Sequence, residues 1–198
     1  GLINKFLSKD ENLSFFYPVF QRLKKNTEVE KIFKSISEFS EKSEVRYVGG
    51  CVRKIINQEE VDDIDLATNI EPKKVIEILK KDNIEFHEIG VEHGTITARI
   101  NRQKFEITSL REDISTDGRH AKVKFSDNWH QDASRRDFTF NSIYADLNGN
   151  LFDPFNGKKD LEIGEVKFIG EADKRIKEDY LRILRYVRFF LNYSKIKH

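Results

Sequence analysis

The chain lacks the cysteine pairs that stabilise small secreted proteins and the long apolar runs that anchor proteins in membranes. Cys51 is the only cysteine among 198 residues, which excludes an internal disulfide and a cysteine-based zinc site. No apolar run approaches the roughly 18 residues of a transmembrane helix, and residues 1–10 lack the basic-then-apolar pattern of a signal peptide. We therefore expect no membrane association and a reducing, cytoplasmic location.

No single sign of charge predominates in the sequence. The chain has 35 Lys and Arg against 34 Asp and Glu, a formal net charge of +1, so any nucleic acid must be bound by a local patch. Apolar residues are scarce at 38%, yet 16 Phe can supply a core, which excludes a fully disordered chain.

The spacing of apolar residues predicts a mixed sheet with flanking helices. Two helices are expected within residues 14–42, and a long functional loop is expected at residues 111–130, which are polar and lack periodicity. Asn148-Gly149 predicts a hairpin turn. The other expected strands cover residues 45–48, 63–66, 84–89, 95–100, 104–110, 143–147 and 151–155, and the other expected helices cover residues 52–57, 132–142 and 171–192, with one more from Pro72.

Two glycines stand between the expected strand at residues 45–48 and the helix after it. Gly49 and Gly50 would let backbone amides approach a phosphate closely, and the N-terminus of a helix adds positive potential. The pattern indicates a phosphate-binding turn. The alternative is an ordinary tight turn between a strand and a helix.

Three carboxylates are candidates for a metal site. Asp63 and Asp65 lie two residues apart on an expected strand, which places both side chains on one face. Unpaired carboxylates that close repel each other, and a divalent cation such as Mg²⁺ removes the conflict. Glu106 would be the third carboxylate if its strand is a neighbour. The alternatives are an exposed acidic strand end and an ordinary polar strand position.

Residues 135–141 combine arginines with an acid and an amide. Guanidinium groups such as that of Arg136 suit phosphate, and Asp137 and Asn141 suit sugar hydroxyls. The alternative is a solvated helix face with internal ion pairs. On the last expected helix, Asp179 and Arg182 share a face, with Arg185 nearby. The alternative there is a helix with salt bridges between residues three apart.

These segments together resemble the head of class II CCA-adding enzymes and bacterial poly(A) polymerases, which belong to the DNA polymerase β-like nucleotidyltransferases. Seven motifs stand in the family's order with compatible spacing. They are GGCVR (49–53), DIDLAT (63–68), FEIT (105–108), DGRHA (117–121), RRDFT (135–139), DPFNG (153–157) with Asp160, and EDYLR (178–182). Lys54 stands where the family usually has Asp, and Asn57 stands near a position that is commonly Gly.

The resemblance implies template-independent addition of CMP and AMP, from CTP and ATP, to the 3′ end of tRNA, with release of pyrophosphate. It implies that Asp63, Asp65 and Glu106 are catalytic and hold two Mg²⁺ ions. The residues that it implies in nucleotide binding are Gly49, Gly50, Arg53, Arg136, Asp137, Asn141, Asp179, Arg182 and Arg185.

Hydrogen-bond chemistry suggests how one acid–arginine pair could select bases. Cytosine and adenine each present an amine donor beside a ring-nitrogen acceptor, so Asp179 can accept from the amine and Arg182 can donate to the ring. Uracil and guanine reverse that pattern, and Asp179 would then face an acceptor. The pair would thus admit C and A and reject U and G.

The resemblance also implies an α+β fold with a mixed sheet of about five strands, followed by a helical neck, with body and tail helices beyond this chain. We divide the chain into an N-terminal helical extension (1–44), a catalytic head (45–147), and a hairpin with the start of the neck (148–198). Residues 117–121 resemble the flexible loop that CCA-adding enzymes use to switch from C to A.

Three other functions stay open from the sequence. One is a poly(A) polymerase or an enzyme that adds only part of CCA, and a tRNA lacking its 3′ end would separate these by their products. Another is a non-catalytic RNA-binding module that has kept the fold. The last is a purely structural domain with solvated charged faces, which would not bind nucleotides in the presence of Mg²⁺.

Overall fold

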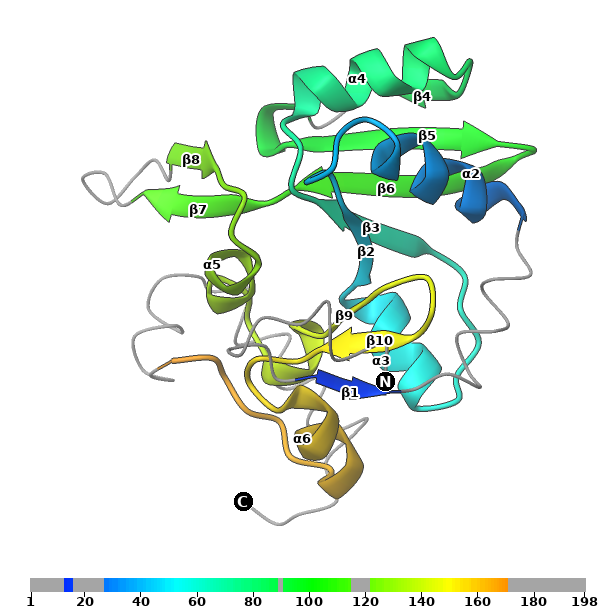
Figure 1. The fold of residues 1–198 in the computed structure, drawn as a ribbon. Coiled ribbons are helices and arrows are strands. Elements are labelled where there is room, and N and C mark those ends of the chain that lie inside the picture. The colour runs from blue at the N-terminus through cyan, green and yellow to red at the C-terminus, as the bar shows by residue number, and fades with distance from the viewer. Residues whose placement is uncertain (1–12, 16–26, 89–90, 115–121, 171–198) are drawn as a thin grey trace.

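The computed structural model describes residues 13–15, 27–88, 91–114 and 122–170, which build a mixed eight-stranded sheet with helices around it (Figure 1). The strands are β1 (Leu13–Phe15), β2 (Val45–Val48), β3 (Ile64–Thr68), β4 (Glu85–His87), β5 (Thr95–Ile100), β6 (Gln103–Ser109), β7 (Arg111–Ile114), β8 (Lys122–Phe125), β9 (Tyr144–Ala145) and β10 (Asn150–Phe152). The helices are α2 (Thr27–Ser37), α3 (Gly50–Ile56), α4 (Pro72–Lys81), α5 (Trp129–Ser134) and α6 (Gly157–Ile163), with 3-10 turns η2 (Val91–His93) and η3 (Thr139–Asn141).

The strand order of the large sheet is β1-β10-β9-β2-β3-β6-β5-β4. Among the described strands, only β3 and β6 run parallel, and every other pair is antiparallel. The predicted α+β class with a mixed sheet is confirmed. The sheet is wider than the five strands expected, because β1, β9 and β10 extend it beyond β2.

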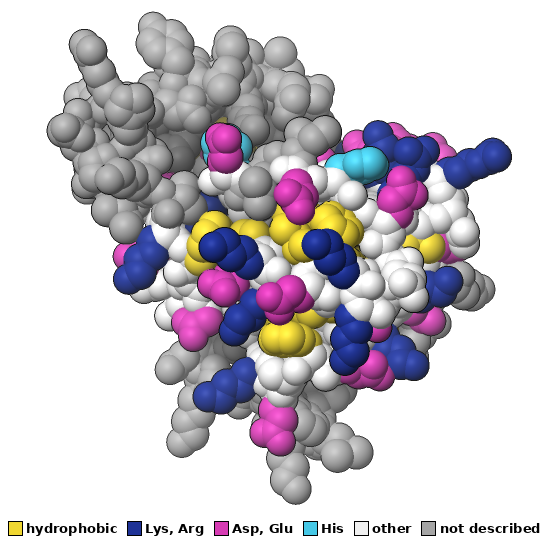
Figure 2. All heavy atoms as spheres, turned by 90° about the horizontal axis from the view of Figure 1, so that it is seen from above, with side chains coloured by type: hydrophobic (Ala, Val, Ile, Leu, Met, Phe, Trp, Pro, Cys, Tyr) yellow, Lys and Arg dark blue, Asp and Glu magenta, His cyan; other side chains and the backbone are white. Residues whose placement is uncertain are grey.

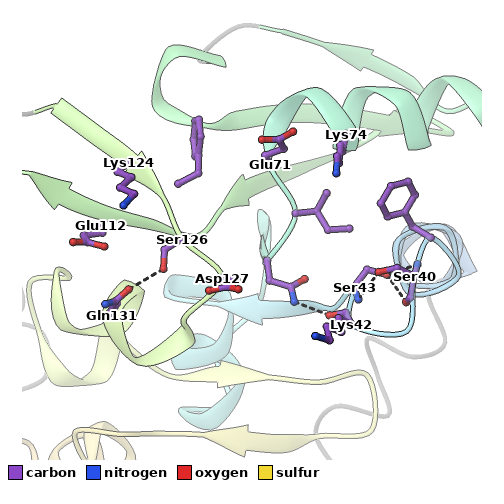
Figure 3. A pocket seen from close by; sticks show the side chains of 14 residues that line it. Ser40, Lys42, Ser43, Glu71, Lys74, Glu112, Lys124, Ser126, Asp127 and Gln131 are labelled. Atoms are coloured by element: carbon purple, nitrogen blue, oxygen red, sulfur yellow. Dashed lines mark hydrogen bonds between the residues drawn. The ribbon is translucent and has the colours of Figure 1, made fainter.

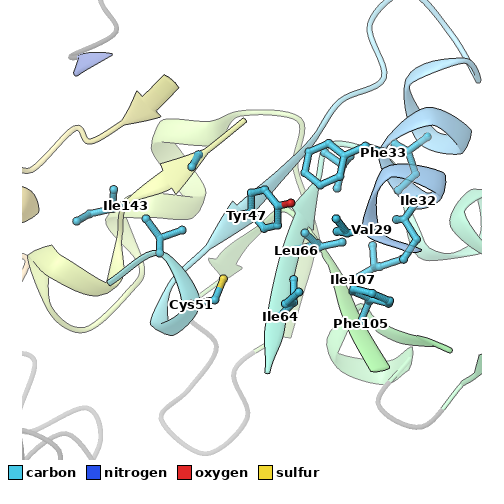
Figure 4. Close-up of a cluster of buried hydrophobic side chains, with 14 of the residues drawn as sticks. Val29, Ile32, Phe33, Tyr47, Cys51, Ile64, Leu66, Phe105, Ile107 and Ile143 are labelled. Atoms are coloured by element: carbon cyan, nitrogen blue, oxygen red, sulfur yellow. The ribbon is translucent and has the colours of Figure 1, made fainter. Parts of the chain in front are cut away.

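The two faces of β3 have different surroundings, because successive side chains on a strand point to opposite sides. Ile64 and Leu66 belong to the main core, which they share with Ile32 of α2 and with side chains of β2 and β6 (Figure 4). Ala67, which alternates with them, packs with Ala133 of α5 in a second cluster. Asp65 lies on the same side of the strand as Ala67, away from the main core.

Several elements differ from the sequence-based predictions. Residues 13–15, which border and overlap the first expected helix, pair with β10 as a short edge strand, and residues 16–26 lie outside the described part. The expected loop at 111–130 contains the hairpin β7–β8. This hairpin pairs with no other described strand. Its sequence lacks the apolar alternation that marks a half-buried strand, which is why a loop is expected from the sequence.

The expected helix at residues 132–142 is interrupted in the structure. Helix α5 ends at Ser134, and the chain becomes extended at Phe138, which pairs with Phe168 in an isolated bridge. That pairing joins residues thirty positions apart, so local periodicity does not reveal it. The helix expected at residues 171–192 lies outside the described residues.

The proposed division of the chain at residues 44 and 147 stays a prediction. Helix α2 nevertheless shares the main core with residues 45–147, and β10 belongs to the same sheet. Within the described ranges, no helix is both long and apolar enough to cross a membrane.

The DPFNG segment locks the turn η3 in place. Asp153 accepts hydrogen bonds from the backbone N–H groups of Gly157 (2.8 Å) and Lys158 (2.9 Å) at the start of α6. Thr139 donates its hydroxyl to Asp160 at 2.6 Å. A side chain at Gly157 would meet the backbone oxygen of Thr139 at 2.1 Å, so only glycine allows α6 and η3 to approach this closely.

This close approach predicts that Gly157→Ala strongly destabilises the fold. The added methyl group must displace the backbone of η3, so we expect the free energy of unfolding to fall by about 3 kcal/mol. Urea denaturation measures the loss. Gly50→Ala is the matched control, because its nearest neighbour would lie at an ordinary 3.6 Å. A Gly157→Ala protein as stable as the Gly50→Ala protein would contradict the tight contact.

Candidate active site

The parallel pair β3 and β6 brings two predicted carboxylates together. Asp65 of β3 stands in register with Glu106 of β6. Neighbouring strands lie about 4.8 Å apart, and both side chains alternate with residues of the main core, so they share the other face of the sheet. Asp63 is exposed and lies one residue before β3, which begins later than expected. The condition on which Glu106 became a candidate is therefore met.

The pKa of Asp65 is raised to about 6. Burial is the largest cause, and the neighbouring carboxylates of Glu106 and Asp63 add to it, while the positive charge of Arg136 opposes the rise. Asp65 is half-buried whereas Glu106 is exposed, so the pair opens toward solvent. A bound cation would therefore stabilise this pair of carboxylates more than it would stabilise either carboxylate alone.

The acids fit a divalent cation that completes its coordination with a substrate. Among the described residues, no group of three or more His, Cys, Asp or Glu side chains is gathered closely enough to hold a metal ion. The three predicted ligands thus do not form a closed cage. Two carboxylates with open positions are, however, the usual protein contribution to Mg²⁺ bound with phosphates. Asp65 and Glu106 provide this arrangement.

The predicted glycine turn lies beside the later arginine motif. Gly49 has φ 72° and ψ −129°, a conformation that glycine adopts without strain, and its N–H bonds to Ile143 O at 3.3 Å. A Cβ atom at Gly49 would lie 3.9 Å from Nη1 of Arg136 and 3.8 Å from the backbone oxygen of Asn141. The turn at the start of α3 thus has Arg136 and η3 as direct neighbours.

Arg53, Asn141 and Asp137 form a chain of hydrogen bonds. Nη1 of Arg53 donates to Oδ1 of Asn141 at 2.5 Å, and Nδ2 of Asn141 donates to Oδ1 of Asp137 at 3.2 Å. The same Oδ1 atom accepts the backbone N–H of Phe138 at 2.8 Å. Arg53 and Asp137 are buried. The structure therefore brings three of the predicted nucleotide-binding residues together and fixes their orientation.

Asp132 was not among the sequence candidates, although it organises the arginine motif. Its carboxylate is buried and forms ion pairs with Arg135 and Arg136, each at 3.2 Å. It also accepts the hydroxyl of Tyr144 at 2.5 Å. Burial would raise the pKa of Asp132, but Arg136 and Arg135 outweigh burial and lower it. The spacing of three and four residues from the arginines was a usable signal, whereas no local pattern points to Tyr144.

Other candidates lie outside the described residues. These are the DGRHA segment at 117–121 and the residues Asp179, Arg182 and Arg185.

A groove of about 580 Å³ is lined by neither Asp65 nor Glu106 (Figure 3). It includes residues 69–71, which follow the end of β3, whereas Asp65 lies near the start of that strand. Phe39 and Phe125 line it and are exposed. Its charged lining consists of Lys42, Lys74, Lys124, Glu71, Glu112 and Asp127. Three positive and three negative groups leave the groove without a net charge that would favour an anionic or cationic ligand.

The surface seen from above in Figure 2 is similarly mixed. Lys and Arg side chains alternate with Asp and Glu over the described residues, and hydrophobic side chains show between them. The view has no broad basic face, in keeping with the net charge of +1. On the face shown, positive charge is therefore spread over separate Lys and Arg side chains.

The raised pKa of Asp65 predicts that ionisation of this residue costs stability. Its folded-state pKa of about 6 lies above the usual value, so stability is lost as the pH rises from about 4 through 6. In the absence of divalent cations, Asp65→Asn should match the wild-type chain at pH 4. At pH 7.5 it should be more stable by about 1–2 kcal/mol, after allowance for solvent screening.

Urea denaturation at the two pH values measures the difference, with the exposed neighbour as control in Asp62→Asn. The account fails if Asp65→Asn differs from wild type by the same amount at both pH values.

Known proteins resemble this chain in sequence and in fold. A family model described as the poly A polymerase head domain matches residues 45–167. CCA tRNA nucleotidyltransferase 1, mitochondrial, of Homo sapiens is 48% identical over 160 residues, which cover 79% of this chain and 37% of that protein. The CCA-adding enzyme of Oceanobacillus iheyensis is 41% identical over 145 residues, covering 72% of this chain and 35% of that enzyme.

A solved structure has a similar fold. The crystal structure of Bacillus stearothermophilus CCA-adding enzyme in complex with CTP has a TM-score of 0.75 and 30% identity, over 90% of this chain and 41% of that one. This chain spans somewhat more than a third of the length of the curated relatives. Since the family model covers well over half of the chain, the protein belongs to the poly A polymerase head domain family, to which the motifs of the CCA-adding enzymes had pointed.

Proposed function

We propose that this chain is the catalytic head of a template-independent nucleotidyltransferase that adds CMP and AMP, from CTP and ATP, to the 3′ end of tRNA. The observation that carries the proposal is the register of Asp65 and Glu106 on the parallel pair β3–β6. Arg136 adds to it, because its charge acts on Asp65 and its guanidinium lies beside Gly49. Relatives named as CCA tRNA nucleotidyltransferase or CCA-adding enzyme support this reaction over poly(A) synthesis. A related structure described as a complex with CTP supports the nucleotide substrate.

Nucleotidyltransferases of this family generally use divalent metal ions. In the proposal, Asp63, Asp65 and Glu106 hold two Mg²⁺ ions, which when bound stabilise charge on the attacking and leaving oxygens. The half-buried Asp65 would contribute from within the site, and the exposed Asp63 and Glu106 would turn toward the ions from its rim. The raised pKa of Asp65 supports this role, because its carboxylate is buried and also faces like charge, and a bound cation would offset both effects.

The remaining residues orient the nucleotide. Gly49, Gly50, Arg53 and Arg136 support the triphosphate, and the 3′-hydroxyl of the tRNA attacks the α-phosphate while pyrophosphate leaves. Asp137 accepts a hydrogen bond from the ribose 2′-hydroxyl. The bonds from Phe138 and Asn141 to Oδ1 of Asp137 hold that carboxylate in one orientation, which supports such a role.

Base selection in this proposal belongs to Asp179 and Arg182, with Arg185 beside them. Asp179 accepts from the exocyclic amine of cytosine or adenine, and Arg182 donates to the ring. A carbonyl of uracil or guanine at the same place would face the carboxylate and leave it unpaired, which discriminates strongly. A cytoplasmic location is also part of the proposal, although the human relative is named as mitochondrial.

Replacement of the acids tests the reaction directly. Glu106→Ala and Asp63→Ala should each lower the rate of CMP incorporation into a tRNA lacking CCA by about 100-fold or more, since each removes charge that the reaction needs. Radiolabelled CTP and gel analysis measure the rate, in this chain and in the complete gene product. Glu77→Ala is the matched control, an exposed acid on α4, which packs against the main core. Near-normal incorporation by either acid variant would exclude the assignment.

A further inference from the structure

Arg136 is held by two buried partners before any ligand is considered. Its Nη2 atom lies 3.2 Å from Oδ2 of Asp132, and its Nε atom donates to the hydroxyl of Tyr144 at 3.1 Å. Tyr144 in turn donates to the same Oδ2 atom of Asp132 at 2.5 Å. The three groups form a closed triangle of hydrogen bonds, so the guanidinium cannot rotate without breaking at least one of them.

Both partners of Arg136 are themselves immobilised. Asp132 is 1% exposed, and Tyr144 is fully buried, with its ring edge-on to Trp129 and tilted against Phe152. Tyr144 belongs to β9, whose backbone is paired on both sides, with β2 and with β10. Arg136 is therefore held by one residue of the sheet, Tyr144, and one residue of a helix, Asp132, and not by a surface loop.

The other oxygen of Asp132 reaches a different part of the chain. Oδ1 accepts the backbone N–H of Arg111, the first residue of β7, at 3.1 Å, and also Nε of Arg135 at 3.2 Å. One carboxylate thus ties the base of the β7–β8 hairpin to the guanidinium of Arg136. A shift of the hairpin base relative to α5 has to change the hydrogen bonds of this carboxylate.

Arg136 points from the triangle into the candidate active site. Its Nη1 atom lies 3.9 Å from the position that a Cβ of Gly49 would occupy, and its charge lowers the pKa of Asp65 against the effects of burial and of Glu106. Burial acts to lower the pKa of Arg136, but Tyr144 and Asp132 outweigh burial and raise it, so this residue stays cationic at every relevant pH. A fixed positive group beside a glycine turn is suited to an anionic phosphate.

We propose that Asp132 and Tyr144 are positioning residues, which fix Arg136 beside the Gly49 turn and link it to the first residue of β7. The inference rests on the proposed function in one respect, namely that Arg136 contacts the triphosphate of the incoming nucleotide. Preorganisation then means that the triphosphate meets a guanidinium already aimed at it. Loss of the triangle leaves the charge in place but releases its orientation.

Tyr144→Phe is the variant that isolates this role, because it removes the hydroxyl and keeps the packed ring. We expect the KM for CTP and for ATP to rise by about five- to tenfold, and equally, because the triphosphate is common to both. The kcat should stay within about threefold of wild type. Asp132→Asn should act in the same direction, but it removes a buried counter-charge and so also destabilises the fold.

Ser142→Ala is the matched control. Its hydroxyl is also buried and donates to a backbone oxygen of α5, that of Ala133 at 2.8 Å, whereas the triangle of Arg136 is made by side chains alone. A purely structural role of Tyr144 predicts that Tyr144→Phe and Ser142→Ala lower the melting temperature alike and leave KM unchanged. That result would overturn the proposal.

A double-mutant cycle shows whether Tyr144 acts through Arg136. Arg136→Ala removes the guanidinium, so adding Tyr144→Phe to it should change KM by less than about twofold. Independent, multiplying effects of the two substitutions would contradict the link. The comparison of KM among the variants tests the positioning role. The presence of activity in the wild-type protein tests the proposed function.

The orientation of Arg136 can be measured without any nucleotide. The Nε–H proton of Arg136 should be protected from exchange with solvent in the NMR spectrum of the wild-type chain and of Ser142→Ala, and unprotected in Tyr144→Phe. An unprotected proton in wild type would overturn the positioning role even if the enzyme is active. If wild type binds and turns over no nucleotide while the proton is protected, the proposed function fails and the geometry of Arg136 stands.

Discussion

The pairing of β3 with β6 is the constraint on which the site depends. It is the one parallel pair among the described strands, and its register sets Asp65 directly beside Glu106. A shift of one residue would turn Glu106 into the main core and bring Phe105 or Ile107 to the open face. The buried side chains of both strands oppose such a shift, because each would have to leave the core that they share with α2.

Packing elsewhere in the sheet offsets the unfavourable free energy of placing these carboxylates side by side. Packing of Ile64, Leu66 and Phe105 stabilises the strands. Burial is the main cause that raises the pKa of Asp65, and the repulsion between the carboxylates adds to it. The positive charge of Arg136, held by Asp132 and Tyr144, offsets part of this repulsion. Ionised Asp65 therefore costs stability, and in the proposed function a cation with its phosphate ligands would offset that cost.

Much of this site could be predicted from sequence because its motifs are local. The strand at residues 45–48, the glycine turn and the helix from Pro72 depend on neighbours in the chain, and each is present as expected. The adjacency of β3 and β6 could only be stated as a condition, because the sequence of a strand does not show which other strand it pairs with. The resemblance to a family supplied what the local pattern lacked.

The errors have a common physical origin in long-range pairing. The helix expected at 132–142 is interrupted because Phe138 pairs with Phe168, and the edge strand β1 exists because β10 accepts it. The bond between Asp132 and Tyr144 could not be predicted either, because Tyr144 comes from the next hairpin. In each case the sequence nearby was compatible with the wrong structure, and a distant segment decided the outcome.

Product analysis on a tRNA that lacks its CCA end tests the central claim most directly. The chain and the complete gene product would be incubated in parallel with Mg²⁺ and CTP, ATP or both. Our account predicts that the complete gene product adds C, C and A in that order and then stops. A long ladder of A residues would make the protein a poly(A) polymerase, and no product from the complete gene product would contradict a catalytic role for the Asp65–Glu106 pair.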